Sequence, residues 1–518
     1  MNRSRKIVLF LREYWPQIGV SLLFFWLWYL CFPFLPGPDP YGAPVNQWGI
    51  GVYILMRIIY NPLEYIMSSD FGAQISDLCY SYMDPQLVEN GSRTFVYHLG
   101  ACIATLLHSF IAYYSLLSII NALRAKYGHI VGFVICILLM IITCGFLFFV
   151  KNTDLFFCST SLLVISICLK HYIEQKRYGT TIFVLLLLLI SIAVGYRKNS
   201  IILLPLFIWM ILALYHRTCQ MKPLRFYTSG LILSIIAALP LSTSLLMPVL
   251  HMEDTYGEEV FMSSDYACMR LLKDKTIDLD NINGIKEGRY VLFMQNYERF
   301  GTCNNMKEKW INEIYDSPLI FFEARTINYA QFLSLGCLPS FVVRFLREKH
   351  KDIYFPDSDD FCTIVDFINN PRQRFEGYKH IHHISEFGNY KALFKRSLFN
   401  YDLFFNWEVY AVIIIIEYIL SFICMIILIV RLLYYKCLTH LQKWILWCAL
   451  LEFGHLTSFL IFTPTPDFRY HFFSIVMGFL VLGLFIINTH DPKGQLSACP
   501  LCIKDLRDLQ RKYTSIFS

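Results

Sequence analysis

The stretch EVYAVIIIIEYILSFICMIILIVR, residues 408–431, decides the class of fold. It has a charged residue at each end, and one further charged residue, Glu417, interrupts its apolar interior. A helix needs ~20 mostly apolar residues to cross the hydrocarbon core of a bilayer, and this stretch is long enough. The sequence therefore predicts a membrane-spanning helix here, and similar stretches recur along the chain.

Further segments meet the same criterion and bring the predicted spans to ten. The others cover residues 17–36, 98–122, 128–150, 155–170, 180–196, 199–216, 227–249, 444–462 and 470–488. The composition agrees, because 56% of the 518 residues are hydrophobic and 16% are charged, whereas soluble domains have ~45–50% and ~25%. This argues against a soluble enzyme, a disordered chain and a nucleic-acid-binding protein, and predicts an all-α polytopic membrane protein.

Charge is unevenly distributed along the chain. Residues 250–406 are 27% charged with a net charge of −4, whereas the rest of the chain is 12% charged with a net charge of +10. We therefore expect a soluble extracytoplasmic domain inserted into a membrane protein. The chain is predicted to begin with a transmembrane core of seven helices, residues 1–249, which includes a long outside loop at 37–97. The soluble domain follows at 250–406, then three further helices at 407–489 and a cytoplasmic tail at 490–518.

Lys and Arg in the short connecting segments predict the orientation. With the N-terminus in the cytoplasm, the inside segments carry 20 basic residues and the outside segments, without the large loop, carry 6. Both termini are therefore expected in the cytoplasm. The outside loop 37–97 contains an apolar stretch, residues 49–60, that is too short to span and is expected at the membrane interface.

Charged residues at the outer ends of the predicted helices are the best candidates for function. Cations there break the positive-inside trend, and their hairpins are only a few residues long. Cations at this depth suit the phosphate of a polyprenyl lipid, which Arg binds bidentately and Lys attracts as a point charge. A single cation of this kind more often reaches phospholipid headgroups, so only the whole set of residues indicates a binding site. The set consists of Asp39, Lys151, Asp154, Arg197, Lys198, Asp467, Arg469 and Tyr470.

Three motifs in this set resemble those of GT-C membrane glycosyltransferases. They are KNTDLF at residues 151–156, RKN at residues 197–199 and PDFRY at residues 466–470, and each opens a predicted helix. The stretch 310–325 is similar to a loop helix of such enzymes, which include the lipid-A aminoarabinose transferase and protein O-mannosyltransferases of bacteria. The resemblance implies a GT-C-like fold in a bacterial inner membrane.

The resemblance also implies a reaction, in which a sugar moves from polyprenyl phosphate to a lipid, glycan or protein acceptor on the outer face, with inversion. Such transfer needs a base for the acceptor hydroxyl, and Asp39 after the first helix matches the family position. Asp70 and Asp77 are alternatives, and an ordinary turn role for Asp39 stays open. The substrate-binding candidates are Lys151, Asp154, Arg197, Lys198, Arg469 and Tyr470, and the four cations among them would hold the lipid phosphate.

Asp154 either orients the acceptor or caps its helix. Some GT-C enzymes use a divalent metal with several acids, but paired acids are scarce on this outer face, so neither a metal nor another cofactor is expected. Glu417, Glu452 and His455 lie inside predicted spans. Glu452 and His455 are three apart on one helix face, and a structural polar contact is favoured over a proton relay.

Two other functions remain open. An O-antigen or polysaccharide polymerase or ligase also has many helices and a large outside loop, where it would place essential arginines. Arginines available in this loop include Arg270, Arg289, Arg325, Arg344 and Arg347. A transporter or flippase of lipid-linked glycans is the other alternative, although transporters often have repeated halves and the sequence shows no repeat.

Overall fold

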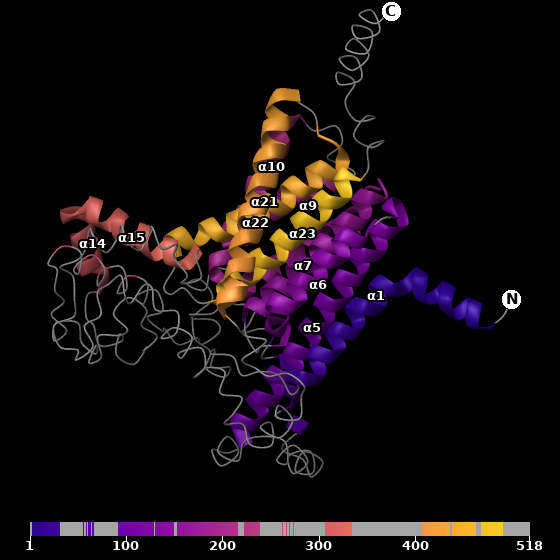
Figure 1. Cartoon of the computed structure of the whole chain (residues 1–518). Coiled ribbons are helices and arrows are strands. Elements are labelled where there is room, and N and C mark those ends of the chain that lie inside the picture. Colours follow the sequence, from indigo (N-terminus) through magenta and orange to yellow (C-terminus); the bar gives the residue numbers. More distant parts are fainter. Residues whose placement is uncertain are drawn as a thin grey trace, which may run out of the picture.

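The chain folds into a bundle of α-helices, as seen in a computed structural model (Figure 1). The structure describes residues 3–31, 92–128, 130–149, 153–215, 222–238, 306–333, 407–435, 438–462 and 468–490, with isolated positions between 55 and 66 and between 262 and 273. Among these residues, the only β-type pairing is an isolated bridge between Tyr178 and Tyr215. The prediction of an all-α protein is confirmed for this part of the chain.

Ten helices overlap the ten segments that the sequence predicts to span the membrane. They are α1 (Arg3–Cys31), α5 (Ser92–Tyr127), α6 (Val131–Cys144), α7 (Thr153–Ile173), α8 (Thr180–Tyr196), α9 (Leu204–Leu214), α10 (Pro223–Ala238), α21 (Trp407–Tyr435), α22 (His440–Phe462) and α23 (Phe472–Thr489). Among the described residues, four helices are long and apolar enough to cross a membrane: those containing Cys102–Tyr127, Thr153–Ile173, Val412–Tyr434 and Phe472–Thr489. The chain thus has the helices of a membrane protein with several spans, and the count of ten crossings stays a prediction.

In the described part of the chain, three short 3-10 helices join or extend the α-helices. They are η1 (Gly145–Phe149), η2 (Lys198–Leu203) and η6 (Phe468–His471). The predicted span 128–150 is therefore α6 continued by η1, and the predicted span 199–216 is η2 continued by α9. Pro205 is one reason for the second break, because proline fits the first turn of an α-helix but cannot donate a backbone hydrogen bond within it.

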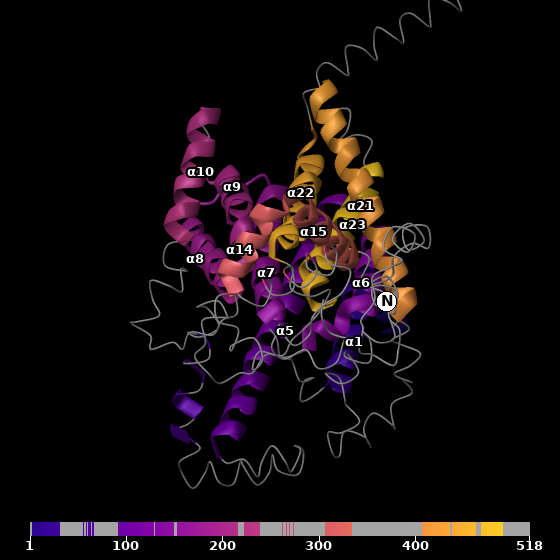
Figure 2. The same ribbon diagram turned by 90° about the vertical axis from the view of Figure 1, so that its left-hand side faces the viewer.

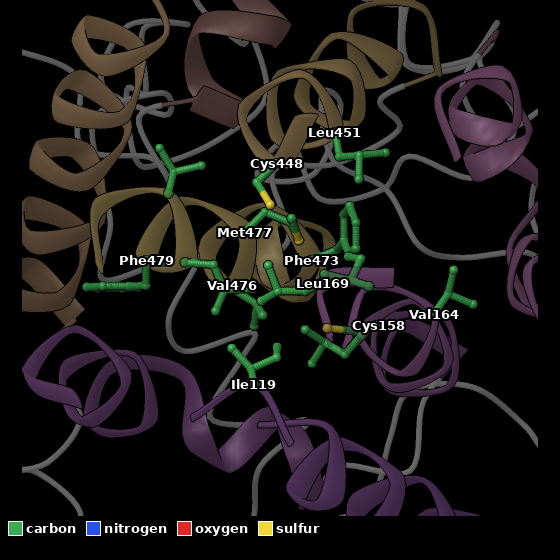
Figure 3. Packing of buried hydrophobic residues seen from close by; sticks show 14 of the residues in the cluster. Ile119, Cys158, Val164, Leu169, Cys448, Leu451, Phe473, Val476, Met477 and Phe479 are labelled. Atoms are coloured by element: carbon green, nitrogen blue, oxygen red, sulfur yellow. The ribbon is translucent and has the colours of Figure 1, made fainter. Parts of the chain in front are cut away.

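Helices α7 and α23 lie at the centre of the bundle, and α21 lies at its edge. About three-quarters of the apolar window of α23 is buried (78%), against 39% for α21. Side chains from α5, α7, α22 and α23 meet in the core, among them Ile119, Cys158, Cys448 and Phe473 (Figure 3). The exposed residues of α21, such as Ile416 and Ile423, are apolar, as expected for a helix that faces lipid.

Glycines bring α6 and α23 close together. A Cβ atom on Gly483 would lie 2.7 Å from the Phe133 ring and 3.2 Å from the Phe133 Cα atom. A Cβ atom on Gly132 would lie 2.5 Å from Ile486. Small residues at a crossing allow the backbones of membrane helices to approach and gain packing contacts. The C-terminal helix is therefore held tightly against the first half of the chain.

Two helices of the predicted soluble domain are described, α14 (Met306–Asp316) and α15 (Pro318–Leu333), and they lie to one side of the bundle (Figures 1 and 2). Ser317 separates them because the residue before a proline disfavours the helical conformation, while Pro318 itself suits a first turn. Helix α15 contacts α22. Figure 2 also shows α8, α9 and α10 grouped on one side, with α21, α22 and α23 on the other.

Candidate functional site

An ion pair joins the outer ends of two helices, as the sequence orients them. Arg197 Nη1 contacts Asp154 Oδ1, and the two side chains are only 10% and 6% exposed. Asp154 lies in the first turn of α7, where its negative charge also suits the helix dipole. Arg197 follows the end of α8 in an extended conformation, with φ −144° and ψ 113°. This break between α8 and η2 is what places Arg197 outside either helix, beside the first turn of α7.

Two aromatic rings hold the guanidinium of Arg197. Its Cζ atom lies 4.5 Å from the centre of the Tyr470 ring and 5.6 Å from the centre of the Phe459 ring. The two rings stack on each other with their centres 5.6 Å apart. A guanidinium within ~6 Å of a ring centre gains cation–π stabilisation, and more so when it is shielded from water. We call Asp154, Arg197, Phe459 and Tyr470 the outer cluster.

A second arginine connects the outer cluster to helix α15. Arg325 is 5% exposed, and its guanidinium donates to the carbonyl of Leu460 at 2.6 and 3.1 Å and to that of Phe459 at 3.3 Å. These carbonyls belong to the last turn of α22, where helical partners are missing and the helix dipole favours a cation. Arg325 therefore caps α22 beside the ring that holds Arg197.

The structure brings together three of the predicted site residues, Asp154, Arg197 and Tyr470, which come from three different hairpins. Lys198 opens η2, directly after Arg197, and the backbone of Arg469 lies in η6, directly before Tyr470. The side chains of these two cations lie outside the described part of the structure. So do Asp39 and Lys151, whose roles stay predictions.

Asp154 has a role that neither sequence interpretation named. It is neither simply a helix cap nor an open acceptor-binding carboxylate, because Arg197 occupies one of its oxygens. Its Oδ2 atom is buried and has no hydrogen-bond partner among the described residues. Asp154 therefore fixes the position of Arg197, and the pair carries no net charge.

A second polar cluster lies inside the bundle. Glu417 of α21 is 2% exposed and Glu452 of α22 is 0% exposed. Ser421 donates a hydrogen bond to Glu452 Oε2. A Cβ atom on Gly478 of α23 would overlap Glu417 Oε1 and lie 3.0 Å from Glu452 Oε1. We call Glu417, Glu452, Ser421 and Gly478 the buried carboxyl cluster.

Histidines between the two clusters pair with hydroxyl groups. His455 Nδ1 lies 2.7 Å from Ser474 Oγ, and His471 Nδ1 lies 2.8 Å from Tyr418 Oη. The sequence places Glu452 and His455 on one face of a helix, but in the structure each pairs with a serine of a different neighbouring helix. Such hydrogen bonds tie α21, α22 and α23 together, as polar residues do between membrane helices.

A metal centre has no support from the described residues, because no group of three or more His, Cys, Asp or Glu side chains among them is arranged to hold an ion. The expectation of no metal stays a prediction, since Asp39, Asp70 and Asp77 lie outside the described part. In comparisons with protein families, curated proteins and solved structures, no match to this chain was found.

Proposed function

We propose that the protein is a membrane glycosyltransferase that moves a sugar from a polyprenyl-phosphate donor to a lipid, glycan or protein acceptor at the outer face. The observation that supports this most is the outer cluster. Residues of three motifs that are far apart in the sequence meet there as Asp154, Arg197 and Tyr470. A merely lipid-facing cation would have no need for a buried partner and two aromatic rings.

The outer cluster would serve as a rigid base for anion binding. Because Asp154 neutralises Arg197, the excess positive charge at this end of the bundle comes from the neighbouring residues Lys151, Lys198 and Arg469. Lys198 directly follows Arg197 in the chain and Arg469 directly precedes Tyr470, and the guanidinium of Arg197 lies over the Tyr470 ring. We assign these three cations to the lipid phosphate, with Arg197 orienting the segment that carries Lys198.

The proposed reaction needs one proton acceptor. The acceptor oxygen attacks the anomeric carbon of the sugar, the bond from that carbon to the phosphate oxygen breaks, and the polyprenyl phosphate leaves with the bonding electrons. The acceptor proton passes to Asp39, our candidate base. Fixed cations stabilise the charge that develops on the leaving phosphate, which is the main electrostatic task of such a site.

The two alternative functions differ in how well the described residues support them. A polymerase or ligase would use arginines of the outside loop, yet Arg325 is engaged in capping α22. A transporter of lipid-linked glycans draws support from the buried carboxyl cluster, because ionisable residues inside the membrane often lie on transport pathways. Transport of a labelled lipid-linked glycan by vesicles containing the purified protein, without any sugar transfer, would favour that alternative.

The test combines cells and purified protein. Mass spectrometry of cell-surface glycans with and without the protein identifies the sugar that it adds, and the matching polyprenyl-phosphate sugar then serves as donor in vitro. Asp39→Asn should reduce transfer by ~10²–10⁴-fold, the usual contribution of a general base. Lys176→Gln is the matched control, because Lys176 is 71% exposed and lies at the opposite end of α7. Full activity of Asp39→Asn would remove Asp39 as the base, and unchanged surface glycans would refute the proposal.

A further inference from the structure

The buried carboxyl cluster has a chemistry that the proposed transfer reaction does not use. Glu417 and Glu452 come from different helices and both approach Gly478, because a Cβ atom there would overlap Glu417 Oε1 and lie 3.0 Å from Glu452 Oε1. Both oxygens of Glu417 and Oε1 of Glu452 are buried and have no hydrogen-bond partner among the described residues. Ser421 satisfies only Oε2 of Glu452.

No cation among the described residues balances these carboxyl groups. The described ion pairs involve other residues. The titratable groups around the cluster are thiols and one phenol: Cys136 and Cys144 on α6, Tyr418 and Cys424 on α21, and Cys448 on α22. The nearby His455 forms a hydrogen bond with Ser474. Helix α23 contributes Gly478 and Ser474 and no charge.

Two ionised carboxylates in this position would be strongly unfavourable. Each would lose its hydration in a low-dielectric interior, and the like charges would repel across a very short distance. A proton between facing oxygens removes both costs and supplies the missing hydrogen bond. A metal ion is less suitable, because the carboxylate of Glu417 already fills the space that Gly478 leaves open and an ion would need six or more oxygen ligands if it were Ca²⁺ or Mg²⁺.

We propose that Glu417 and Glu452 form a proton-binding site within the helix bundle, in which an exchangeable proton is shared between their facing Oε1 atoms. Gly478 is the structural requirement of this site, because a methyl group at that position would displace Glu417. The shared proton would join α21 to α22, in addition to the hydrogen bond from Ser421 to Glu452. It is independent of the sugar-transfer proposal, since it uses none of the residues assigned to that reaction.

Dicyclohexylcarbodiimide tests the site, because this apolar reagent modifies protonated carboxyl groups in apolar surroundings. The purified full-length protein in detergent is treated at neutral pH and its peptides are analysed by mass spectrometry. We expect an adduct on Glu417 or Glu452 that declines as the pH rises. Glu174 is the internal control, because the hydrogen bond from Lys176 holds the pKa of this exposed carboxyl below its ordinary value and keeps it ionised.

Infrared spectroscopy provides a second readout that does not depend on reagent access. The wild-type protein should show the carbonyl band of a protonated carboxyl group, shifted in D₂O, and the isosteric double variant Glu417→Gln/Glu452→Gln should lack both band and adduct. If the double variant does not fold, the carbonyl band and the adduct of the wild-type protein alone test the proposal. Absence of the band at neutral pH would overturn the proposal. Protection from the reagent by Na⁺ at constant pH would also overturn it, in favour of a cation site.

Discussion

Removal of the Asp154 carboxylate should destabilise the protein severely, because it leaves Arg197 buried without its partner. The substitution is Asp154→Ala, and the comparison is the double variant Asp154→Ala/Arg197→Met. In the wild type the two side chains are only 6% and 10% exposed, so water offers little compensation for a lost partner. Both variants should insert into the membrane, since neither adds charge to a helix.

The expected size follows from this burial. Breaking a buried ion pair by removing one partner costs about 3–5 kcal/mol, whereas replacing both partners by apolar residues is often near neutral. The double variant loses, in addition, the stacking of Arg197 on Tyr470 and Phe459, which is worth about 1–2 kcal/mol. We therefore expect the double variant to be more stable than Asp154→Ala by about 2 kcal/mol.

Unfolding by SDS in mixed micelles, followed by tryptophan fluorescence, measures these differences. A membrane protein of this size often unfolds irreversibly on heating, so an apparent melting temperature serves only as a second, relative readout. Lys176→Ala is the control, because it breaks the exposed pair with Glu174 and should leave the unfolding curve unchanged. A double variant that is less stable than Asp154→Ala by the full cost of Arg197→Met alone would refute the coupling.

Three further predictions concern packing around the outer cluster and the helix crossing. Arg325→Ala should lower the free energy of unfolding by about 1.5–3 kcal/mol, the usual value of hydrogen bonds to a charged group. It should also speed protease cleavage near α14 and α15, and an unchanged cleavage rate would contradict the capping role. Tyr470→Ala should lower the free energy of unfolding by about 1–2 kcal/mol in the SDS assay, and Tyr470→Phe, which keeps the ring over Arg197, should lower it less; equal losses would argue against the cation–π contact. Gly483→Val should lower the free energy of unfolding by about 1–3 kcal/mol by forcing α23 away from Phe133, whereas Gly19→Val, at an open position within α1, serves as its control.

Hydropathy locates the helices well but not their ends. Residues 180–196 are predicted and observed as one helix, α8, because an apolar run and a helix coincide there. Helix α1 begins at Arg3, well before the apolar residues of its predicted span, because basic residues form helix readily outside the hydrocarbon core. The change from α6 to η1 at Gly145 carries no hydropathy signal, although a Cβ atom at this position would lie only 2.8 Å from Leu27.

The candidate site was predictable as a region and not as a set of contacts. Short hairpins place Asp154, Arg197 and Tyr470 at one end of the bundle, so the sequence alone identifies them as neighbours of the membrane surface. Which carboxylate meets which cation depends on how α7, α8 and α22 pack. Local spacing predicted a polar contact between helices for Glu452 and His455 without its partners, which are Ser421 from α21 and Ser474 from α23.

The cap that Arg325 places on α22 connects α15 to the outer cluster. The guanidinium holds the backbone of Phe459 and Leu460, and the ring of Phe459 lies beside Arg197. On α14 and α15 the side chains of Tyr315 and Leu319 are more than four-fifths exposed. An antibody fragment that binds this surface would restrain α15 and, through the contacts of Arg325 and Phe459, the position of Arg197. It would thus restrict the outer cluster without contacting it.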